Sequence, residues 1–287
     1  MHHLVSKLYA GGAKTASRMG LDRSRIVKRV ANLAIDLLKS NYTEIDDHKM
    51  MLDINDSLRL SIKGIYEPFE TELLKNQIGS GNTVLDIGAN IGYYTLIFAK
   101  SVGSEGRVFA FEPDPTNFNL LKQNIALNGY QNVTLEQKAV YSANRTMELF
   151  LNEDNQSDHR IYQTKIHQPC VVVDAVSLDN YFRNGQTVID LIKMDIQGAE
   201  MAALQGMARL LKNNRDIRLV MEFLPTALSR FGTDPKELLT FLSGMGFNFF
   251  NINEDKNRLE STDIFTLMEK YTPTNGKCTN LLCKREI

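Results

Sequence analysis

The feature that most constrains the fold of this chain is the regular alternation of short apolar runs with helical segments from residue 82 onward. The run "TVLDIGA" is almost unbroken in its apolar character, as expected of a strand that is buried on both faces of a sheet. A helical segment follows it, and the pattern then repeats with the strands "GRVFAFEP", "NVTLEQKAV", "VIDLIKMDIQ" and "IRLVMEFL". Strands that alternate with helices predict an α/β fold with a mostly parallel sheet and right-handed crossovers.

Two segments depart from this alternation. Residues 141–182 combine two predicted strands, "MELFL" and "QPCVVVDAVSL", with the polar loop "NEDNQSDHRIYQTK" between them. Near the end of the chain, "FNFFNIN" and "TNLLCKREI" are predicted as two closing strands. We therefore expect strands in addition to those of the alternating unit.

The N-terminal part of the chain has a different pattern. Residues 22–40 carry apolar side chains at helical spacing, with basic side chains on the other face. We expect this helix to pack on the main domain or on a partner subunit, although a basic amphipathic helix is also compatible with a membrane surface. The stretch "HKMMLDINDSLRLSIKG" predicts a hairpin with Asn55–Asp56 at its turn. The chain thus divides into an N-terminal helical and hairpin extension, residues 1–65, and a main domain, residues 66–287.

The composition excludes several classes of protein. With 43% hydrophobic and 23% charged residues, the chain has the balance of a globular domain with a core. The formal net charge of −1 provides no overall attraction to nucleic acid or to an anionic membrane. No apolar run approaches the roughly 20 residues of a membrane span, and three scattered cysteines do not make a disulfide framework. We expect a cytoplasmic protein with no nucleic-acid partner and no stable membrane insertion.

The stretch "VLDIGANIGYYT" has an acid and two glycines where a buried strand becomes a helix. In an open parallel sheet, ligands bind beyond the carboxyl ends of the strands, and glycines there permit a tight turn and a close approach. A dinucleotide site favours glycine at the position of Asn90, between Gly88 and Gly92. An acid such as Asp86 would repel a pyrophosphate and suits a cationic ligand. S-adenosylmethionine, with a cationic amino group and a cationic sulfonium, fits this pattern better than a dinucleotide does.

The next two strands extend the same site. Glu112 ends the second strand, where a carboxylate can accept hydrogen bonds from both hydroxyls of a ribose. Ala139, at the end of the third strand, is small enough for an adenine to lie against it, although a small core residue explains it almost as well. Together with the glycine turn, these residues predict a cofactor site at the carboxyl edge of the sheet.

From about residue 66 to residue 253, the sequence resembles the FkbM family of S-adenosylmethionine-dependent methyltransferases. The resemblance is carried by "YEPFET", "VLDIGANIGYYTLIFA", "VFAFEPDPTNFNLLKQNIALN", "DHRIY", "VSLDNY" and "LIKMDIQGAE". It implies the class I methyltransferase fold, a Rossmann-like three-layer sandwich with a seven-stranded, mostly parallel sheet whose last strand is antiparallel. It also implies methyl transfer to an acceptor oxygen, usually a hydroxyl of a sugar or a natural product. By this resemblance, Glu112 holds the ribose, and the methionine end is held by Asp86, Gly88, Asn90 and Gly92.

A hydroxyl acceptor benefits from a general base, or from a metal ion that lowers its pKa. The candidate catalytic residues are Asp195 after the fourth strand, Glu222 on the fifth, and His159 in the polar loop. The non-catalytic alternatives are that the two acids bind nearby helix N-termini and that the histidine is an ordinary surface residue. Asp195 and Glu222 match two positions of a magnesium site, but Phe223 fills the next one. Magnesium takes oxygen ligands and keeps several of its waters, so two carboxylates can suffice; a divalent metal stays open, although we do not expect one.

The expected partner is a small-molecule or glycan acceptor, and the N-terminal helix is compatible with a homo-oligomer. Two alternatives stay open: methylation of a carboxylate or an amine, which needs less help from a base, and a cofactor-binding module without catalysis. The intact acids Asp86, Glu112 and Asp195 argue against the second. A nucleic-acid methyltransferase would usually show a basic face or, for base amines, an Asn/Asp-Pro-Pro-aromatic string where "DIQG" stands.

Overall fold

The computed structural model describes residues 42–152, 155–185 and 187–285. The chain separates into two compact units, residues 1–66 and 67–287, and each is described by itself. The helix predicted over residues 22–40 lies outside the described residues. Within the described part of the chain, no helix has both the length and the apolar character that crossing a lipid bilayer requires.

The described part of the first unit begins with a hairpin. β1 (Tyr42–Ile45) pairs antiparallel with β2 (His48–Met51). The turn between them has left-handed φ angles of 50° at Asp46 and 66° at Asp47, as a type I′ turn requires. The hairpin prediction with its turn at Asn55–Asp56 is therefore wrong.

Aspartate side chains explain this difference. Asp53 accepts the backbone N–H of Asn55 at 3.0 Å, and Asp56 accepts that of Leu60 at 2.8 Å. Contacts of this kind stabilise turns and helix starts in place of a strand ladder. The chain accordingly passes into the short helix α3 (Leu60–Lys63).

An eight-stranded sheet forms the centre of the second unit, in the order β12-β11-β13-β10-β9-β3-β4-β5. The strands β10, β9, β3, β4 and β5 are parallel to one another, whereas β13 is antiparallel to both of its neighbours, β10 and β11. The bounds are β3 (Thr83–Ile87), β4 (Arg107–Phe111), β5 (Val133–Glu136), β9 (Leu191–Met194), β10 (Arg218–Phe223), β11 (Asn248–Asn253), β12 (Arg258–Thr262) and β13 (Thr279–Lys284). The predicted α/β methyltransferase fold with an antiparallel last strand is confirmed. The eighth strand, β12, was not predicted, because this partly exposed edge strand lacks an apolar run.

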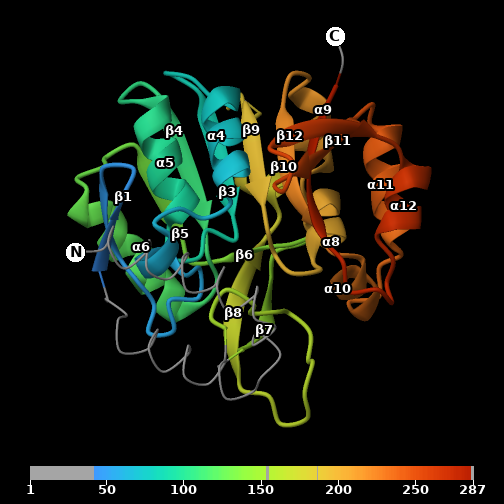
Figure 1. Ribbon diagram of the computed structural model, residues 1–287, viewed down its shortest axis with the longest axis horizontal. Helices are drawn as coiled ribbons and strands as arrows, with labels where there is room; N and C mark the ends of the chain where they lie inside the picture. Colours follow the sequence, from blue (N-terminus) through green and yellow to red (C-terminus); the bar gives the residue numbers. More distant parts are fainter. Residues whose placement is uncertain (1–41, 153–154, 186, 286–287) are drawn as a thin grey trace, which may run out of the picture. The chain divides into compact units, whose positions relative to one another are not determined.

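Helices connect these strands, and α4 and α5 cross the front of the central strands in Figure 1. Their bounds are α4 (Pro68–Gln77), α5 (Tyr93–Val102), α6 (Pro115–Leu127), α7 (Leu178–Tyr181), α8 (Glu200–Gly206), α9 (Ala208–Asn213), α10 (Pro225–Arg230), α11 (Pro235–Gly244) and α12 (Ile264–Lys270). The helical segment after β9 is divided into α8 and α9 at Met207. Asp179 accepts the N–H groups of Arg209 at 2.9 Å and Leu210 at 2.8 Å, which satisfies the start of a second helix.

A smaller sheet of three strands has the order β6-β8-β7. It consists of β6 (Ala139–Val140), β7 (Arg145–Phe150) and β8 (Cys170–Val176), and β7 and β8 form an arm below the main sheet in Figure 1. The third predicted strand therefore ends at Glu136, and Ala139 pairs with Ala175 of β8.

Backbone hydrogen bonds hold the loops at the carboxyl edge of the main sheet together. The N–H groups of Gly88 and Ala89, after β3, both donate to the carbonyl oxygen of Phe111 at 3.0 Å. The N–H of Asp195, after β9, donates to the carbonyl oxygen of Ile87 at 3.0 Å. The loops after β3 and β9 are thereby fixed to the ends of the neighbouring strands β4 and β3.

Candidate functional site

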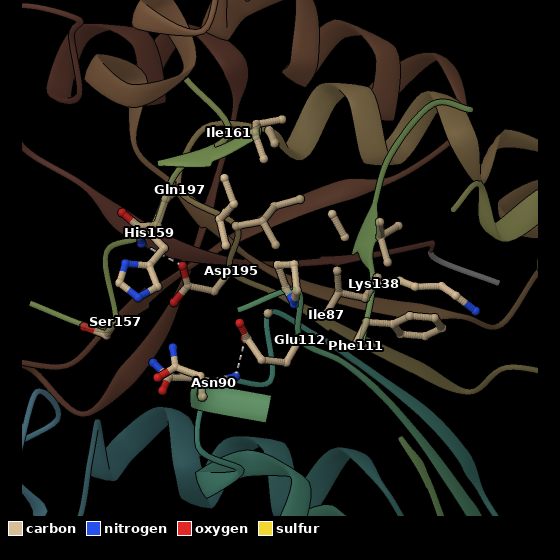
Figure 2. Close-up of a pocket in the computed structure, with 18 of the residues that line it drawn as sticks. Ile87, Asn90, Phe111, Glu112, Lys138, Ser157, His159, Ile161, Asp195 and Gln197 are labelled. Atoms are coloured by element: carbon tan, nitrogen blue, oxygen red, sulfur yellow. Dashed lines mark hydrogen bonds between the residues drawn. The ribbon is translucent and has the colours of Figure 1, made fainter. Parts of the chain in front are cut away.

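A recess opens at this edge, between the loops that follow β3, β4 and β9 and residues 156–161 of the loop after β7 (Figure 2). It encloses about 610 Å³ of empty space, its open mouth included. The predicted site residues that line it are Gly88, Asn90, Glu112, Ala139, His159 and Asp195. The predicted residues that are not among its lining residues are Asp86, Gly92 and Glu222.

Both glycines of the turn have left-handed backbone, and the first is also required by packing within the protein. Gly88 has a φ of 81°, and a Cβ atom there would lie 2.0 Å from the carbonyl oxygen of Asp195. Gly92 has a φ of 95°, and its Cβ would lie 2.7 Å from Cδ1 of Leu121. The turn therefore lets the loops after β3 and β9 pack together, a role that the sequence analysis did not include.

Asp86 lies inside the protein and outside the lining of the recess. It is 1% exposed, and its Oδ2 accepts the hydroxyl of Thr95 at 2.5 Å. Burial raises the pKa of Asp86, although Lys193 and the Thr95 hydroxyl favour the ionised form. The side chain thus joins β3 to the first turn of α5.

Glu112 joins the loops after β3 and β4. Its Oε2 accepts the N–H of Asn90 at 2.8 Å, and its Oε1 accepts the N–H of Asp114 at 2.9 Å. Asn90 itself has a left-handed φ of 51°, which asparagine tolerates better than most residues. Burial raises the pKa of Glu112 to about 8, although both N–H groups oppose this. Each carboxylate oxygen has a second lone pair with which to accept a ligand hydroxyl.

The lining of the recess fits S-adenosylmethionine. Glu112 and Asp195 contribute carboxylates to it. Asn117 is 2% exposed, and its Oδ1 makes no hydrogen bond within the described residues. These oxygens match a ligand that carries hydroxyl, amino and cationic groups, and Phe111 and Ala139 add apolar surface for a ring. A donor group of the ligand can therefore satisfy the Asn117 oxygen, and further donors can share the Glu112 and Asp195 oxygens.

Gln197 connects two of the predicted acids, although the sequence analysis did not select it. Its Nε2 donates to Asp195 Oδ1 at 2.8 Å and to Glu222 Oε2 at 3.0 Å. Its Oε1 accepts a long contact of 3.5 Å from Arg160. The φ of Gln197 is 54°, and such strain at a non-glycine residue is frequent at functional sites. The structure thus brings Asp195 and Glu222 together through one amide group.

The loop that carries Asp195 and Gln197 is held by Glu200. This carboxylate is 1% exposed and accepts the N–H groups of Ile196 at 3.3 Å and Gly198 at 3.1 Å. Burial raises the pKa of Glu200 to about 7, against the effect of these bonds. Within the string "DIQGAE", Glu200 therefore holds the loop that carries Asp195.

A buried lysine lies on the other side of Asp195. Lys193 is 6% exposed, and its Nζ lies 3.5 Å from Asp195 Oδ2 and 4.7 Å from the centre of the Tyr94 ring. Burial alone would lower the pKa of Lys193, but Asp195, Glu70 and other nearby acids raise it above its ordinary value. Lys193 is therefore a permanent cation beside Asp195.

Two further acids, Glu67 and Glu70, interact with Lys193 and form a charged cluster with it and Asp195. Asn280 donates hydrogen bonds to both Glu67 and Glu70, and the Tyr94 hydroxyl donates to Glu67 at 3.0 Å. Burial raises the pKa of both glutamates, to about 8 for Glu70. The cluster thus contains more carboxyl groups than the one lysine can neutralise.

His159 lines the recess, but its hydrogen bonds do not favour a basic role. Its Nδ1 accepts the backbone N–H of Asn152 at 2.9 Å, and its Nε2 lies 4.0 Å from Asp114 Oδ2. A neutral imidazole has one lone pair on nitrogen, and here that lone pair is on Nδ1. The proton is then on Nε2, on the side of Asp114.

Only part of this cluster could be found from the sequence. Lys193 carries a signal, since it is a charged residue within the buried strand "LIKM". Gln197 carries none, because its bridging contacts depend on a left-handed backbone. Among the described residues, no three or more His, Cys, Asp and Glu side chains are grouped so as to hold a metal ion.

Comparisons with known proteins identify the family of the chain. Residues 86–249, more than half of the chain, match the family described as the methyltransferase FkbM domain. A methyltransferase of Beauveria bassiana is 24% identical over 147 residues, which cover 43% of this chain and 57% of the relative. An O-methyltransferase of Aspergillus flavus is 30% identical over 140 residues, which cover 43% and 55%. The chain thus spans little more than half the length of these curated relatives. A solved S-adenosylmethionine-dependent methyltransferase from Aquifex aeolicus has 18% identity, coverage of 80% of this chain and 94% of that chain, and a TM-score of 0.42.

Proposed function

We propose, on the premise that the chain belongs to the FkbM family of S-adenosylmethionine-dependent methyltransferases, that it methylates a hydroxyl oxygen of a sugar, a glycan or a natural product. The pair of carboxylates joined by Gln197 carries this proposal. A hydroxyl gives up its proton only with help, so it benefits most from a carboxylate beside the reacting atoms. A carboxylate acceptor has no such need. The name of the Aspergillus flavus relative, an O-methyltransferase, supports the same reaction class.

When bound, S-adenosylmethionine supplies a methyl group on a positively charged sulfur. The tasks of the chain itself are to orient the acceptor oxygen, to exclude water and to hold the proton that leaves. Asp195 lines the recess, and Glu222 is joined to it through one side chain. We therefore propose that the acceptor binds over the ends of β9 and β10.

A transfer screen tests the proposal. The protein is incubated with cofactor labelled in its methyl group and with a panel of sugars, glycans and hydroxylated natural products. We expect label on a hydroxylated acceptor, in a form that resists mild alkali as an ether does. Glu112→Ala, which is expected to lose cofactor affinity, serves as the negative control. Label that alkali releases as methanol would indicate a methyl ester, and label found only on amines would indicate N-methylation; either result would contradict the proposal.

A further inference from the structure

We propose that the two carboxylates joined by Gln197 have different tasks: Asp195 remains a fixed anion facing the positive charge of the cofactor, and Glu222 accepts the proton of the acceptor hydroxyl. This inference rests on the proposed O-methylation, since only a hydroxyl acceptor must lose a proton to the protein in this way. It is carried by the different surroundings of the two carboxyl groups.

Both oxygens of Asp195 are already bound. Oδ1 accepts the amide of Gln197 at 2.8 Å, and Oδ2 lies 3.5 Å from the ammonium group of Lys193. A donor on one oxygen and a cation at the other both stabilise the ionised carboxylate. Because Asp195 also lines the recess, its negative charge faces whatever binds there.

Glu222 has one oxygen bound and one available. Oε2 accepts the second hydrogen of the Gln197 amide at 3.0 Å. Oε1 makes no hydrogen bond to any residue in the part of the chain that the structure describes. Glu222 therefore keeps an oxygen on which an incoming proton can be held, as a general base requires.

The charges around Glu222 also favour a proton on its carboxylate. Burial raises the pKa of Glu222 well above its ordinary value, and the nearby carboxylates of Asp195, Glu200 and Glu67 raise it further, against the opposing charge of Lys193. The thiol of Cys278 also interacts electrostatically with Glu222. Two neighbouring acids whose surroundings favour different protonation states are a recurrent sign of separate acid–base roles.

The reaction balances with these roles. The acceptor oxygen forms a bond to the methyl carbon while the carbon–sulfur bond breaks, and the sulfur keeps the bonding electron pair. The hydroxyl proton moves to Glu222, which becomes neutral, and solvent removes that proton before the next turnover. Asp195 takes no part in this proton transfer.

Calorimetry tests the task of Asp195 without any acceptor. S-adenosylmethionine carries the sulfonium charge, and S-adenosylhomocysteine, its demethylated product, does not. In Asp195→Asn we expect affinity for S-adenosylmethionine to fall at least about tenfold more than affinity for the product. In the matched variant Glu222→Gln we expect the ratio of the two affinities to stay within about twofold. Binding of the product shows that each variant is folded. Equal effects of the two variants on the ratio would overturn the assignment.

Carboxyl titration by NMR tests the task of Glu222. The protein is labelled at its glutamate carboxyl carbons, and the Glu222 signal is the one that Glu222→Gln lacks. We expect this signal to titrate well above the ordinary glutamate value of about 4.3, and to move higher still in Lys193→Met. A signal that titrates in the ordinary range would overturn the assignment. Because neither measurement uses an acceptor, their failure is distinguishable from failure of the transfer screen.

Discussion

Gly88 and Asp195 are packed so closely that a Cβ atom on Gly88 would lie 2.0 Å from the carbonyl oxygen of Asp195. The two residues come from loops that are more than a hundred positions apart in the sequence, after β3 and β9. The glycine turn and the loop with the candidate catalytic acids are therefore one structural unit, and a change in one displaces the other.

This contact predicts that Gly88→Ala destabilises the protein more than a glycine substitution with the same backbone strain. Gly81 has a similar φ of 85° but nothing within 4 Å of its Cβ position, so Gly81→Ala is the matched control. Left-handed backbone at alanine costs roughly 1–2 kcal/mol in both variants. Overpacking against Asp195 adds about 1–3 kcal/mol in Gly88→Ala alone. Urea unfolding measures the difference, and equal loss of stability in both variants would rule out the contact.

The sequence predicts the fold well because its main signals are local. The apolar runs of β3 and β9 and the glycine stop of α6 at Gly129 are readable without tertiary contacts. The hairpin turn at Asp46–Asp47 was missed because two aspartates carry a left-handed turn that usually needs glycine or asparagine. The position of such a turn depends on contacts that a local pattern does not contain.

The site is predictable where residues follow strand ends directly. Glu112 and Asp195 both lie at the recess as the alternation of strands and helices indicates. Gln197 was missed because its role depends on a strained φ, and Lys193 because a buried charge needs its partners to be known. The roles of these residues follow from long-range geometry, which periodicity does not report.

The next prediction concerns Glu112 and the cofactor. If its carboxylate accepts hydroxyls of the ribose, Glu112→Ala weakens cofactor binding by about 2 kcal/mol or more, since hydrogen bonds to charged groups are the stronger kind. Glu112→Gln keeps one acceptor oxygen and costs less. Calorimetry with S-adenosylhomocysteine measures both losses, and unchanged affinity in the folded alanine variant would place the ribose elsewhere.

Cofactor binding is also expected to release a proton. Burial raises the pKa of Glu112 to about 8, so the free protein holds a proton there at neutral pH. Hydroxyl donors favour the ionised carboxylate and lower that pKa. The binding enthalpy at pH 7 therefore varies with the ionisation enthalpy of the buffer in the wild type and not in Glu112→Gln. A buffer effect of equal size in both proteins would assign the proton to another group.

His159 is expected to contribute little as a base. Its acceptor nitrogen is bound to the N–H of Asn152, so His159→Ala should lower turnover by less than about tenfold, whereas removal of a general base typically costs about 100- to 10,000-fold. Turnover of His159→Ala and Glu222→Gln is compared on the acceptor that the transfer screen identifies. A larger loss in the histidine variant, with an ionisation near the imidazole value of about 6.5, would make His159 the base.

Glu70 gives a prediction for stability against pH. Burial and the charge of Glu67 raise the pKa of Glu70 from 4.5 to about 8. The folded protein thus binds this proton more tightly than the unfolded chain does, and its stability decreases as pH rises from about 4.5 toward 8. Glu70→Gln has no proton to lose, so its stability relative to the wild type should increase between pH 5 and pH 8. Urea midpoints measured at both pH values check this, and a constant difference would contradict it.

The most direct test of the proposed function is the chemical identity of the bond that the protein forms. The protein, cofactor with an isotope-labelled methyl carbon, and the acceptor found in the screen are incubated together, and the product is examined by carbon NMR. The account predicts a single new methyl resonance at the shift of a methyl ether, with a coupling that connects it to a carbon that carried a hydroxyl group. A methyl resonance at the shift of an N-methyl group or of a methyl ester would contradict it.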